Sequence, residues 1–290
     1  MKIEPRWWQK ETDPDGLRDI YRCGLCFHEC RLPEGRMGLC GARGVRDGAF
    51  VSPYLGYFSS SAVDPIEKKP LHHWRPGSRI FSLGSAGCTM RCPFCQNHGI
   101  ARPTEPLTLT ALPPADLAAK VKSLNLDSVA YTYNEPALQA EYILAAAPRL
   151  REQGIATVLV TNGLFSPELL RDLTPVVEAA NVDLKTFNAL AYTNLGGSLE
   201  MVKNTVTHFL QAGVHLELTT LVVPDVSDDV EEFAALVDWV AGLSPDIPLH
   251  ISRYFPAAAY TAPPTNLNLL DRFQGMAAAR LRHVHLGNVG

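Results

Sequence analysis

The sequence predicts an α/β protein, in which a partial TIM-type barrel follows a small cysteine-rich module. Strand and helix patterns alternate from residue 80 onward, and all seven cysteines lie between residues 23 and 95. Strands that alternate with helices pair in parallel through right-handed crossovers. No G-x-G-x-x-G follows a predicted strand, so an open dinucleotide-binding sheet has no support.

Six or seven β/α units account for the second part of the chain. Strands are expected at about 80–85, 128–133, 155–160, 180–185, 214–222 and 247–252, with a further candidate at 283–287. Helices are expected at about 114–124, 136–153, 166–179, 199–212, 228–242 and 266–281. Asn134 and Ser166, each followed closely by a proline, are typical helix N-caps, and Gly154 and Gly213 are typical helix stops.

The chain is expected to divide into three parts. Residues 1–60 lack sustained periodicity and are rich in Gly, Arg and Cys, so this cysteine-rich metal-binding module needs a metal to fold on its own. Residues 61–79 carry three prolines and are expected to form an extended connecting segment. Residues 80–290 form the barrel.

Composition excludes several classes of partner. A hydrophobic fraction of 46% and a charged fraction of 19% describe an ordinary globular protein. The formal net charge of -4 gives no electrostatic footprint for nucleic acid or for an anionic membrane. Because the N-terminus has no apolar signal region and no run approaches a membrane span, we expect a cytoplasmic protein.

Several predicted strands alternate polar and apolar residues, although strands of a helix-covered parallel sheet are usually apolar throughout. The polar residues on one face are Asp183 and Lys185, His215, Glu217 and Thr219, His250 and Ser252, and His283 and His285. Successive side chains face opposite sides of a sheet, so this face is expected to line a wide polar lumen of an incompletely closed barrel. The alternative is an antiparallel sheet with one solvated face, which conflicts with the helix-length connections.

Cys88, Cys92 and Cys95 follow the first predicted strand at the spacing C-x3-C-x2-C. A cubane iron–sulfur cluster has four irons, so three thiolates leave one iron open for a small molecule. Polar or special sequences also end the next five strands, at 131–136, 161–163, 183–185, 219–224 and 250–256. Active sites of β/α barrels collect at these strand ends.

This combination resembles the radical S-adenosylmethionine (radical SAM) superfamily, in its pyruvate formate-lyase activating enzyme-related branch. Within that branch, the N-terminal C-x2-C-x3-C-x9-C spacing and the segments 64–78, 133–136 and 250–254 are similar to the AmmeMemoRadiSam system radical SAM enzyme. The resemblance covers about residues 23–288. It implies a (β/α)6-type partial barrel and a [4Fe-4S] cluster on the three cysteines. It also implies an external electron donor such as flavodoxin or ferredoxin, and reductive cleavage of SAM to a 5′-deoxyadenosyl radical that abstracts hydrogen from an unidentified substrate.

The resemblance also suggests which residues bind SAM. Phe94 would pack on the adenine, and Asn134 and Glu135 would hold the amino group, since an ammonium needs a carboxylate or amide acceptor. Thr161 and Asn162 would approach the SAM carboxylate or ribose. Further candidates for contact with SAM or substrate are Asp183, Lys185, His215, Glu217, His250 and Arg253.

Each of these residues also has a plain structural interpretation. Phe94 would be a core aromatic, and Asn134 with Glu135 an N-cap and first-turn acid. Asn162 with the following glycine would be an ordinary turn. Asp183 and Lys185 would be an internal ion pair, and the lumen histidines would be hydrogen-bonded core residues.

Cys23, Cys26, Cys30 and Cys40 provide four thiolates, which match a closed structural metal site. Both zinc and an auxiliary [4Fe-4S] cluster accept four cysteines. The spacing differs from that of the bacterial ferredoxins, and this difference favours zinc over an auxiliary cluster. His28 could replace one thiolate, but four thiols are at hand.

Two other functions stay open. A glycyl-radical-enzyme activase would act on a protein partner, whereas other members modify a small molecule or a peptide. A protein of a different class, a non-catalytic zinc-binding interaction protein, would hold zinc at both cysteine groups. That alternative needs a fourth ligand beside Cys88, Cys92 and Cys95, and His98 is the nearest candidate in sequence.

Overall fold

The computed structural model describes residues 3–13, 15–16 and 18–289. Its centre is an eight-stranded sheet in the order β15-β14-β13-β12-β11-β10-β8-β7. All neighbours from β8 to β15 pair in parallel, and β7 joins the edge antiparallel to β8. The strands are β7 (Ser60–Pro65), β8 (Arg79–Gly84), β10 (Ser128–Tyr131), β11 (Ala156–Thr161), β12 (Ala179–Asp183), β13 (His215–Val222), β14 (Leu249–Arg253) and β15 (Val284–Gly287). The seven predicted parallel strands are confirmed.

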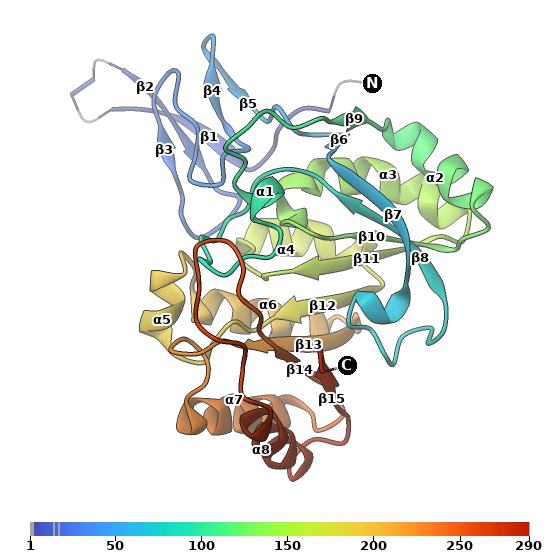
Figure 1. The fold of residues 1–290 in the computed structure, drawn as a ribbon. Helices are drawn as coiled ribbons and strands as arrows, with labels where there is room; N and C mark the ends of the chain where they lie inside the picture. Colours follow the sequence, from blue (N-terminus) through green and yellow to red (C-terminus); the bar gives the residue numbers. More distant parts are fainter. Residues whose placement is uncertain (1–2, 14, 17, 290) are drawn as a thin grey trace.

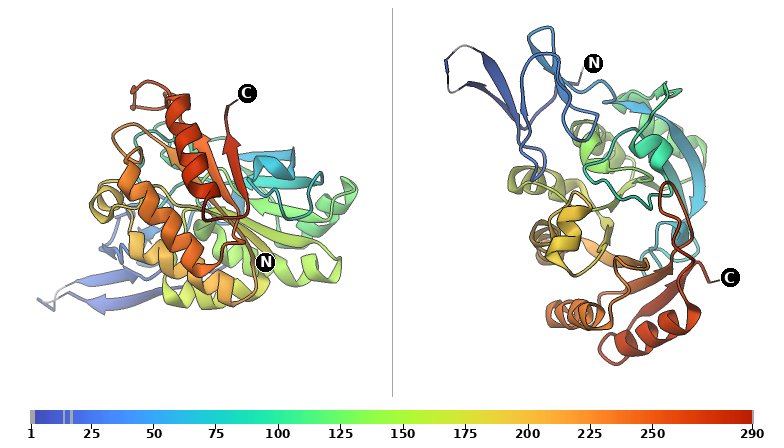
Figure 2. Two further views of the ribbon diagram at one scale, coloured as in Figure 1. Left: turned by 90° about the horizontal axis from the view of Figure 1, so that it is seen from below. Right: turned by 60° about the vertical axis from the view of Figure 1, so that its left-hand side comes forward.

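The helices lie together on one face of this curved sheet, as Figures 1 and 2 show. They are α2 (Pro114–Ser123), η2 (Pro136–Gln139) with α3 (Ala140–Glu152), α4 (Pro167–Leu173) with η3 (Thr174–Val176), α6 (Leu199–Gln211), α7 (Val230–Leu243) and α8 (Leu267–Ala278). The short helices α1 (His98–Ala101) and α5 (Ala189–Asn194) were not predicted. None of the described helices is long and apolar enough to cross a bilayer.

The predicted helix starts are right at one position and wrong at another. Ser166 caps α4 by accepting a hydrogen bond from the amide of Leu169. The cap of η2 is Glu135, not Asn134, because the Glu135 carboxylate accepts from the amide of Ala137. Asn134 instead hydrogen-bonds to the backbone of Ser85 and Gly87, in the loop that follows β8.

The segment 61–79 is not a simple extended connection. Its first residues belong to β7, which pairs with β8 over six residues and extends the main sheet. Residues 66–74 then cross the opening between the two edge strands, with η1 (Ile66–Lys68) at the start. Ile66 and Leu71 are fully buried against inward-facing residues of β8, β10, β11 and β12. This plug segment fills the base of the barrel.

The polar face predicted for the lumen is confirmed by the strand register. Asp183, Thr219, His250 and His285 are neighbours across β12, β13, β14 and β15. The lumen is not wide throughout, however. The amides of His72 and His73, in the plug segment, donate to the buried carboxylate of Glu217 at 3.0 and 2.8 Å, and His250 contacts the same carboxylate at 2.7 Å.

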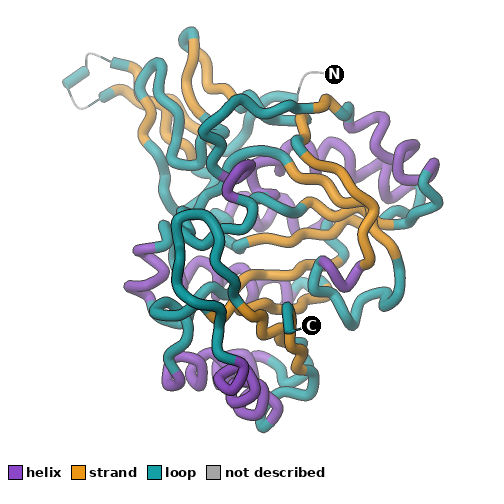
Figure 3. Tube along the Cα trace, in the orientation of Figure 1, coloured by secondary structure: helices purple, strands orange, loops and turns teal. Residues whose placement is uncertain are grey.

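The cysteine-rich module lies beside the barrel and is built mostly of loops (Figures 1 and 3). A three-stranded antiparallel sheet contains β1 (Trp8–Thr12), β2 (Asp19–Cys23) and β3 (Arg31–Leu32). A hairpin joins β4 (Gly44–Arg46) to β5 (Ala49–Val51), and β6 (Tyr57–Phe58) pairs with β9 (Thr110–Ala111). Five positions of the predicted domains lie outside the described residues. Residues 1–2, 14 and 17 belong to the predicted module of residues 1–60, and residue 290 belongs to the predicted barrel.

Candidate active site at the strand ends

The three-cysteine loop follows β8 and lines a cavity of about 320 Å³ at the carboxyl ends of the strands. Seven of the predicted site residues line the same cavity: Phe94, Asn134, Glu135, Thr161, Asn162, Asp183 and Lys185. They come from separate strand ends, from β8 to β12. The topology therefore brings together residues that are almost 100 positions apart in sequence.

Glu135 is the most buried acid of this cavity, with 1% of its surface exposed. Its carboxylate accepts hydrogen bonds from the Thr161 hydroxyl at 2.8 Å and from the Asn162 amide at 3.0 Å, besides the Ala137 amide. Burial raises the pKa of Glu135 to about 7, although these three hydrogen bonds oppose the rise. The carboxylate is thus held in a fixed place, and no lysine or arginine among the described residues pairs with it.

Asp183 and Lys185 form the expected ion pair, with Lys185 Nζ 2.7 Å from Asp183 Oδ2. Burial disfavours the Lys185 ammonium, but Asp183 and Cys92 outweigh that effect and raise its pKa. Both side chains stay partly exposed, at 30% and 18%. The pair can therefore still contact a ligand in the cavity.

Asn134 and Asn162 tie the cysteine loop to the neighbouring strand ends. Asn134 accepts from the Ser85 amide and donates to the Gly87 carbonyl, both at 2.9 Å. The Asn162 side chain donates to Thr89 Oγ1 at 2.9 Å. Their amides are occupied by the protein, which favours a positioning role in this site. Phe94 is buried, with Tyr254 and Tyr260 edge-on to its ring.

His250 and Arg253, predicted as site residues, do not line the cavity. His250 lies among the rings of His72 and His285 and contacts Glu217, as its structural interpretation predicted. Arg253 donates to the Thr265 carbonyl and packs over Phe255. His215 also contacts Glu217, at 3.0 Å.

Lys68, Lys69 and Tyr133 are among the cavity residues that were not predicted as site residues from the sequence. Lys69 is buried, forms a 2.7 Å ion pair with Asp64, and lies 4.5 Å from the centre of the Tyr133 ring. The Tyr133 hydroxyl donates to the same Asp64 oxygen at 2.6 Å. The sequence signals for this cluster were the charged run Glu67-Lys68-Lys69, inside a segment expected to be loop, and the family resemblance of segments 64–78 and 133–136.

Comparison with known proteins identifies the family. The radical SAM superfamily description matches residues 83–237, a range that contains the three-cysteine loop and β10–β13. An uncharacterized protein of Methanocaldococcus jannaschii is 33% identical over 273 residues, which cover 92% of this chain and 81% of the relative. The chain belongs to the radical SAM superfamily.

More distant proteins share this fold. A 7-carboxy-7-deazaguanine synthase of Thermococcus kodakarensis is 27% identical over 198 residues, covering 61% of this chain and 78% of the relative. A radical SAM methyltransferase from Sphaerobacter thermophilus has a crystal structure that covers 96% of this chain and 75% of its own, with a TM-score of 0.56 at 14% identity. These likenesses confirm the mixed α/β fold with a parallel sheet.

Radical SAM membership implies a [4Fe-4S] cluster and SAM, and the cavity fits both. Three thiols and the side chains of Glu135, Asp183 and Lys185 line the same cavity, which at about 320 Å³ is large enough for a small molecule. In the described residues, no three His, Cys, Asp or Glu side chains form a group that could hold one metal ion as they stand. His98 does not line the cavity and its ring contacts the Cys95 carbonyl. Because radical SAM proteins are enzymes, membership of the superfamily argues against a non-catalytic zinc-binding interaction protein.

Proposed function

We propose that this protein reductively cleaves SAM at a [4Fe-4S] cluster on Cys88, Cys92 and Cys95 and uses the resulting radical to abstract hydrogen from a substrate. The observation that carries the proposal is the shared cavity, in which three thiols face the polar ends of β10, β11 and β12. Bound there, the cluster supplies one electron to SAM, which then breaks into methionine and a 5′-deoxyadenosyl radical.

Glu135 is proposed to hold the SAM ammonium. Its carboxylate already accepts three protein hydrogen bonds and has capacity for a fourth. Thr161 and Asn162 fix the carboxylate, so their part in binding is to position Glu135. Asn134 is proposed to position the cysteine loop through Ser85 and Gly87.

Lys185 is proposed to bind the carboxylate of SAM, and Asp183 is proposed to bind its ribose. An ammonium attracts the SAM carboxylate, and the Asp183 carboxylate accepts hydrogen bonds from ribose hydroxyls. Phe94 would cover one face of the adenine, because its ring lies in the cavity wall beside the last cysteine.

The substrate is proposed to lie on the side of the cavity formed by Lys68, Lys69 and Tyr133. These residues come from η1 and the end of β10 and are not needed for the SAM contacts above. The Asp64–Lys69–Tyr133 cluster is held by short hydrogen bonds, which lower the pKa of Asp64 to about 2 against the opposing effect of burial. An external donor of the flavodoxin or ferredoxin class would supply the electron.

The experiment is anaerobic reconstitution with iron and sulfide, followed by reduction in the presence of SAM. We expect 5′-deoxyadenosine and methionine in equal amounts, measured by chromatography with mass detection. A full cluster that yields no 5′-deoxyadenosine would refute the proposal. Formation of a glycyl radical on an added glycyl-radical enzyme would identify the activase alternative.

A further inference from the structure

Histidines gather where the plug segment meets the last strands of the barrel. Six of the nine histidines of the chain lie together there: His72 and His73 on the plug segment, His215 on β13, His250 on β14, His283 just before β15 and His285 on β15. We call this group the histidine cluster. A second cavity, of about 180 Å³, reaches it and shares no lining residue with the candidate active site.

A buried carboxylate holds the plug segment within the histidine cluster. Glu217 has none of its surface exposed, and its oxygens accept from the amides of His72 and His73. The rings of His215 and His250 contact the same oxygens at 3.0 and 2.7 Å. An ionised carboxylate offers about four acceptor positions, so these four donors use all of them. Protons that enter the cluster must therefore go to the other rings.

One hydrogen bond joins the plug segment to β15, at the far edge of the sheet. His73 Nε2 lies 2.8 Å from His285 Nε2. A bond between two imidazoles needs one N–H donor and one bare nitrogen, so it is lost when both rings carry a second proton. Because the chain runs from β7 directly into the plug segment, this bond closes the opening between the two edge strands.

The surroundings keep these rings neutral near pH 7. Burial lowers the pKa of His72, His73 and His285, the last to about 4, and neighbouring histidines add to the effect, whereas Glu217 opposes it. The other titratable groups that face these rings or the cavity beside them are Glu67, His215, Asp246, His250 and His283.

The ring nitrogens engage one another and Glu217 instead of turning toward a common point. Among the described residues, no three His, Cys, Asp or Glu side chains are placed to hold one metal ion. His73 is exposed to solvent while Glu217 is buried. The cluster is thus arranged to exchange protons with solvent at one end and to hold the plug segment at the other.

We propose that the histidine cluster is a proton-sensitive latch, in which protonation of both His73 and His285 breaks their hydrogen bond and frees the plug segment from β15. The ordinary pKa of a histidine is 6.5 and that of His285 in the closed latch is about 4, so the open latch takes up the proton more readily. The stability of the closed latch is therefore fully present above about pH 6.5 and is lost as the pH falls through 4.

The latch has a consequence for the cavity, and this consequence rests on the proposed function. The plug segment also carries Lys68 and Lys69, which line the side of the cavity proposed for the substrate. Lys69 is held there by Asp64 at 2.7 Å. Release of the histidine end would loosen the segment that presents both lysines, so acid would disturb the substrate side of the cavity.

The test of the latch is hydrogen exchange on reconstituted protein without SAM. The amides of His72 and His73 report directly, because they donate to Glu217. Their protection factors, which are corrected for the intrinsic effect of pH on exchange, should fall about tenfold from pH 7.5 to pH 5.5, the effect of His285 alone. Protection factors that stay constant over this range would overturn the proposal.

His285→Gln separates the latch from general acid sensitivity. Glutamine keeps a hydrogen-bonding amide but takes up no proton, so we expect protection close to that of the parent at pH 7.5 and the tenfold fall to be largely lost. His73→Gln makes the same prediction if His285→Gln does not fold. His208→Gln, on α6 and outside the cluster, is the control and should keep the fall. A full tenfold fall in both cluster variants would refute the latch.

The amide of Lys69 tests whether the latch reaches the cavity. It bonds to the Ile66 carbonyl at 2.8 Å, at the opposite end of the plug segment from His73. If the segment loosens as a unit, the protection of this amide falls with that of His72 and His73. Constant protection at Lys69 would refute the effect on the cavity. SAM cleavage is not part of either readout, so failure of the latch and failure of the proposed function are distinguishable.

Discussion

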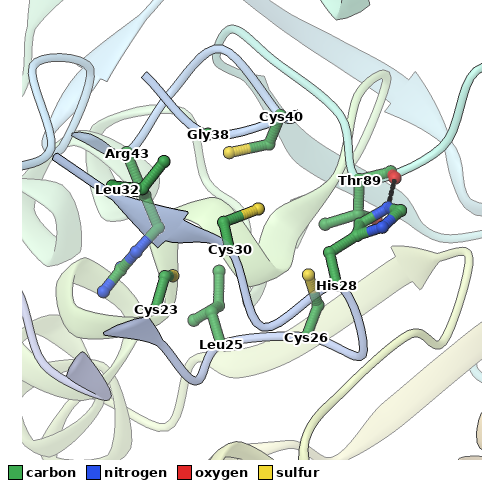
Figure 4. A pocket seen from close by; sticks show the side chains of 10 residues that line it. All are labelled: Cys23, Leu25, Cys26, His28, Cys30, Leu32, Gly38, Cys40, Arg43 and Thr89. Atoms are coloured by element: carbon green, nitrogen blue, oxygen red, sulfur yellow. Dashed lines mark hydrogen bonds between the residues drawn. The ribbon is translucent and has the colours of Figure 1, made fainter. Parts of the chain in front are cut away.

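The three-cysteine loop and the four-cysteine site (Cys23, Cys26, Cys30 and Cys40) lie in opposite surroundings. The loop opens into a cavity of about 320 Å³ lined by Glu135, Asp183 and Lys185. The four-cysteine site encloses about 10 Å³ against Leu25 and Leu32 (Figure 4). Three thiolates in a roomy cavity would leave one position of a bound metal centre open to a ligand, whereas four thiolates in a closed cavity would leave none. The two cysteine groups thus differ in the number of thiols and in the polarity of the walls around them. These differences are the ones expected between a reactive site and a structural site.

The difference between the two cysteine groups predicts its largest effect on the rate of SAM cleavage. Cys88→Ala removes one of the three thiolates, so we expect 5′-deoxyadenosine formation to fall to background, a loss of more than about 10³-fold. Cys30→Ala should cost less when dithionite is the reductant, since it leaves the cavity intact. Both rates are measured anaerobically in the same assay. Equal losses in the two variants would show that the two cysteine groups are not functionally distinct.

The junction between the two regions depends on a glycine. Gly87 has a φ of +90°, and a Cβ there would lie 2.6 Å from the Cys40 carbonyl oxygen and 2.9 Å from Ala42 Cβ. Gly87→Ala combines backbone strain with overpacking, so it should destabilise the protein by roughly 2–5 kcal/mol. The free energy of unfolding in urea measures this.

Gly99→Ala is the matched control for that experiment. Gly99 lies in α1, and a Cβ there would meet nothing within 4 Å. Alanine in a helix should be neutral or should stabilise by up to about 1 kcal/mol. If Gly87→Ala were as harmless as Gly99→Ala, the two cysteine regions would not be packed as tightly as we describe.

The sequence was sufficient for the barrel because strand and helix periods alternate over long stretches. It missed β7 because Ser-Ser-Ala-Val-Asp-Pro is weak as a strand on its own and is held by its pairing with β8. The polar residues at the strand ends were predictable, since parallel topology brings the ends of β10, β11 and β12 together.

Residues whose surroundings depend on the plug segment could not be predicted in the same way. Alternation places His250 on the lumen face, but it does not reveal that His72 and Glu217 cover it. Lys69 reaches the cavity because the plug segment, which carries it, is held against the barrel through Glu217, and Tyr133 then meets it through Asp64. Such long-range contacts have no local signal.

A smaller effect is expected from Glu135→Gln. The variant keeps the side chain's size but removes the charge that would face the SAM ammonium, and a charged hydrogen bond contributes about 1.5–3 kcal/mol. We expect the Kd for SAM to rise roughly 10–100-fold, measured by calorimetry on reconstituted protein. Glu152→Gln, at the exposed end of α3, is the control and should change nothing. Unchanged affinity in Glu135→Gln would remove Glu135 from the SAM site.

The pH dependence of the same residue gives the mildest test. The folded pKa of Glu135 is about 7, above its ordinary value of 4.5, so the folded protein takes up a proton that the unfolded chain releases between these values. Without SAM, the stability due to this group is fully present below about pH 4.5 and is lost as the pH rises through 7.

SAM binding needs the ionised carboxylate, so the affinity for SAM rises with pH over the same range. At pH 6 about one carboxylate in ten is ionised, and SAM should bind about tenfold more weakly than on the plateau above about pH 8. Glu135→Gln should flatten this profile. A profile that keeps its slope in the variant would mean that a group other than Glu135 carries the proton linkage.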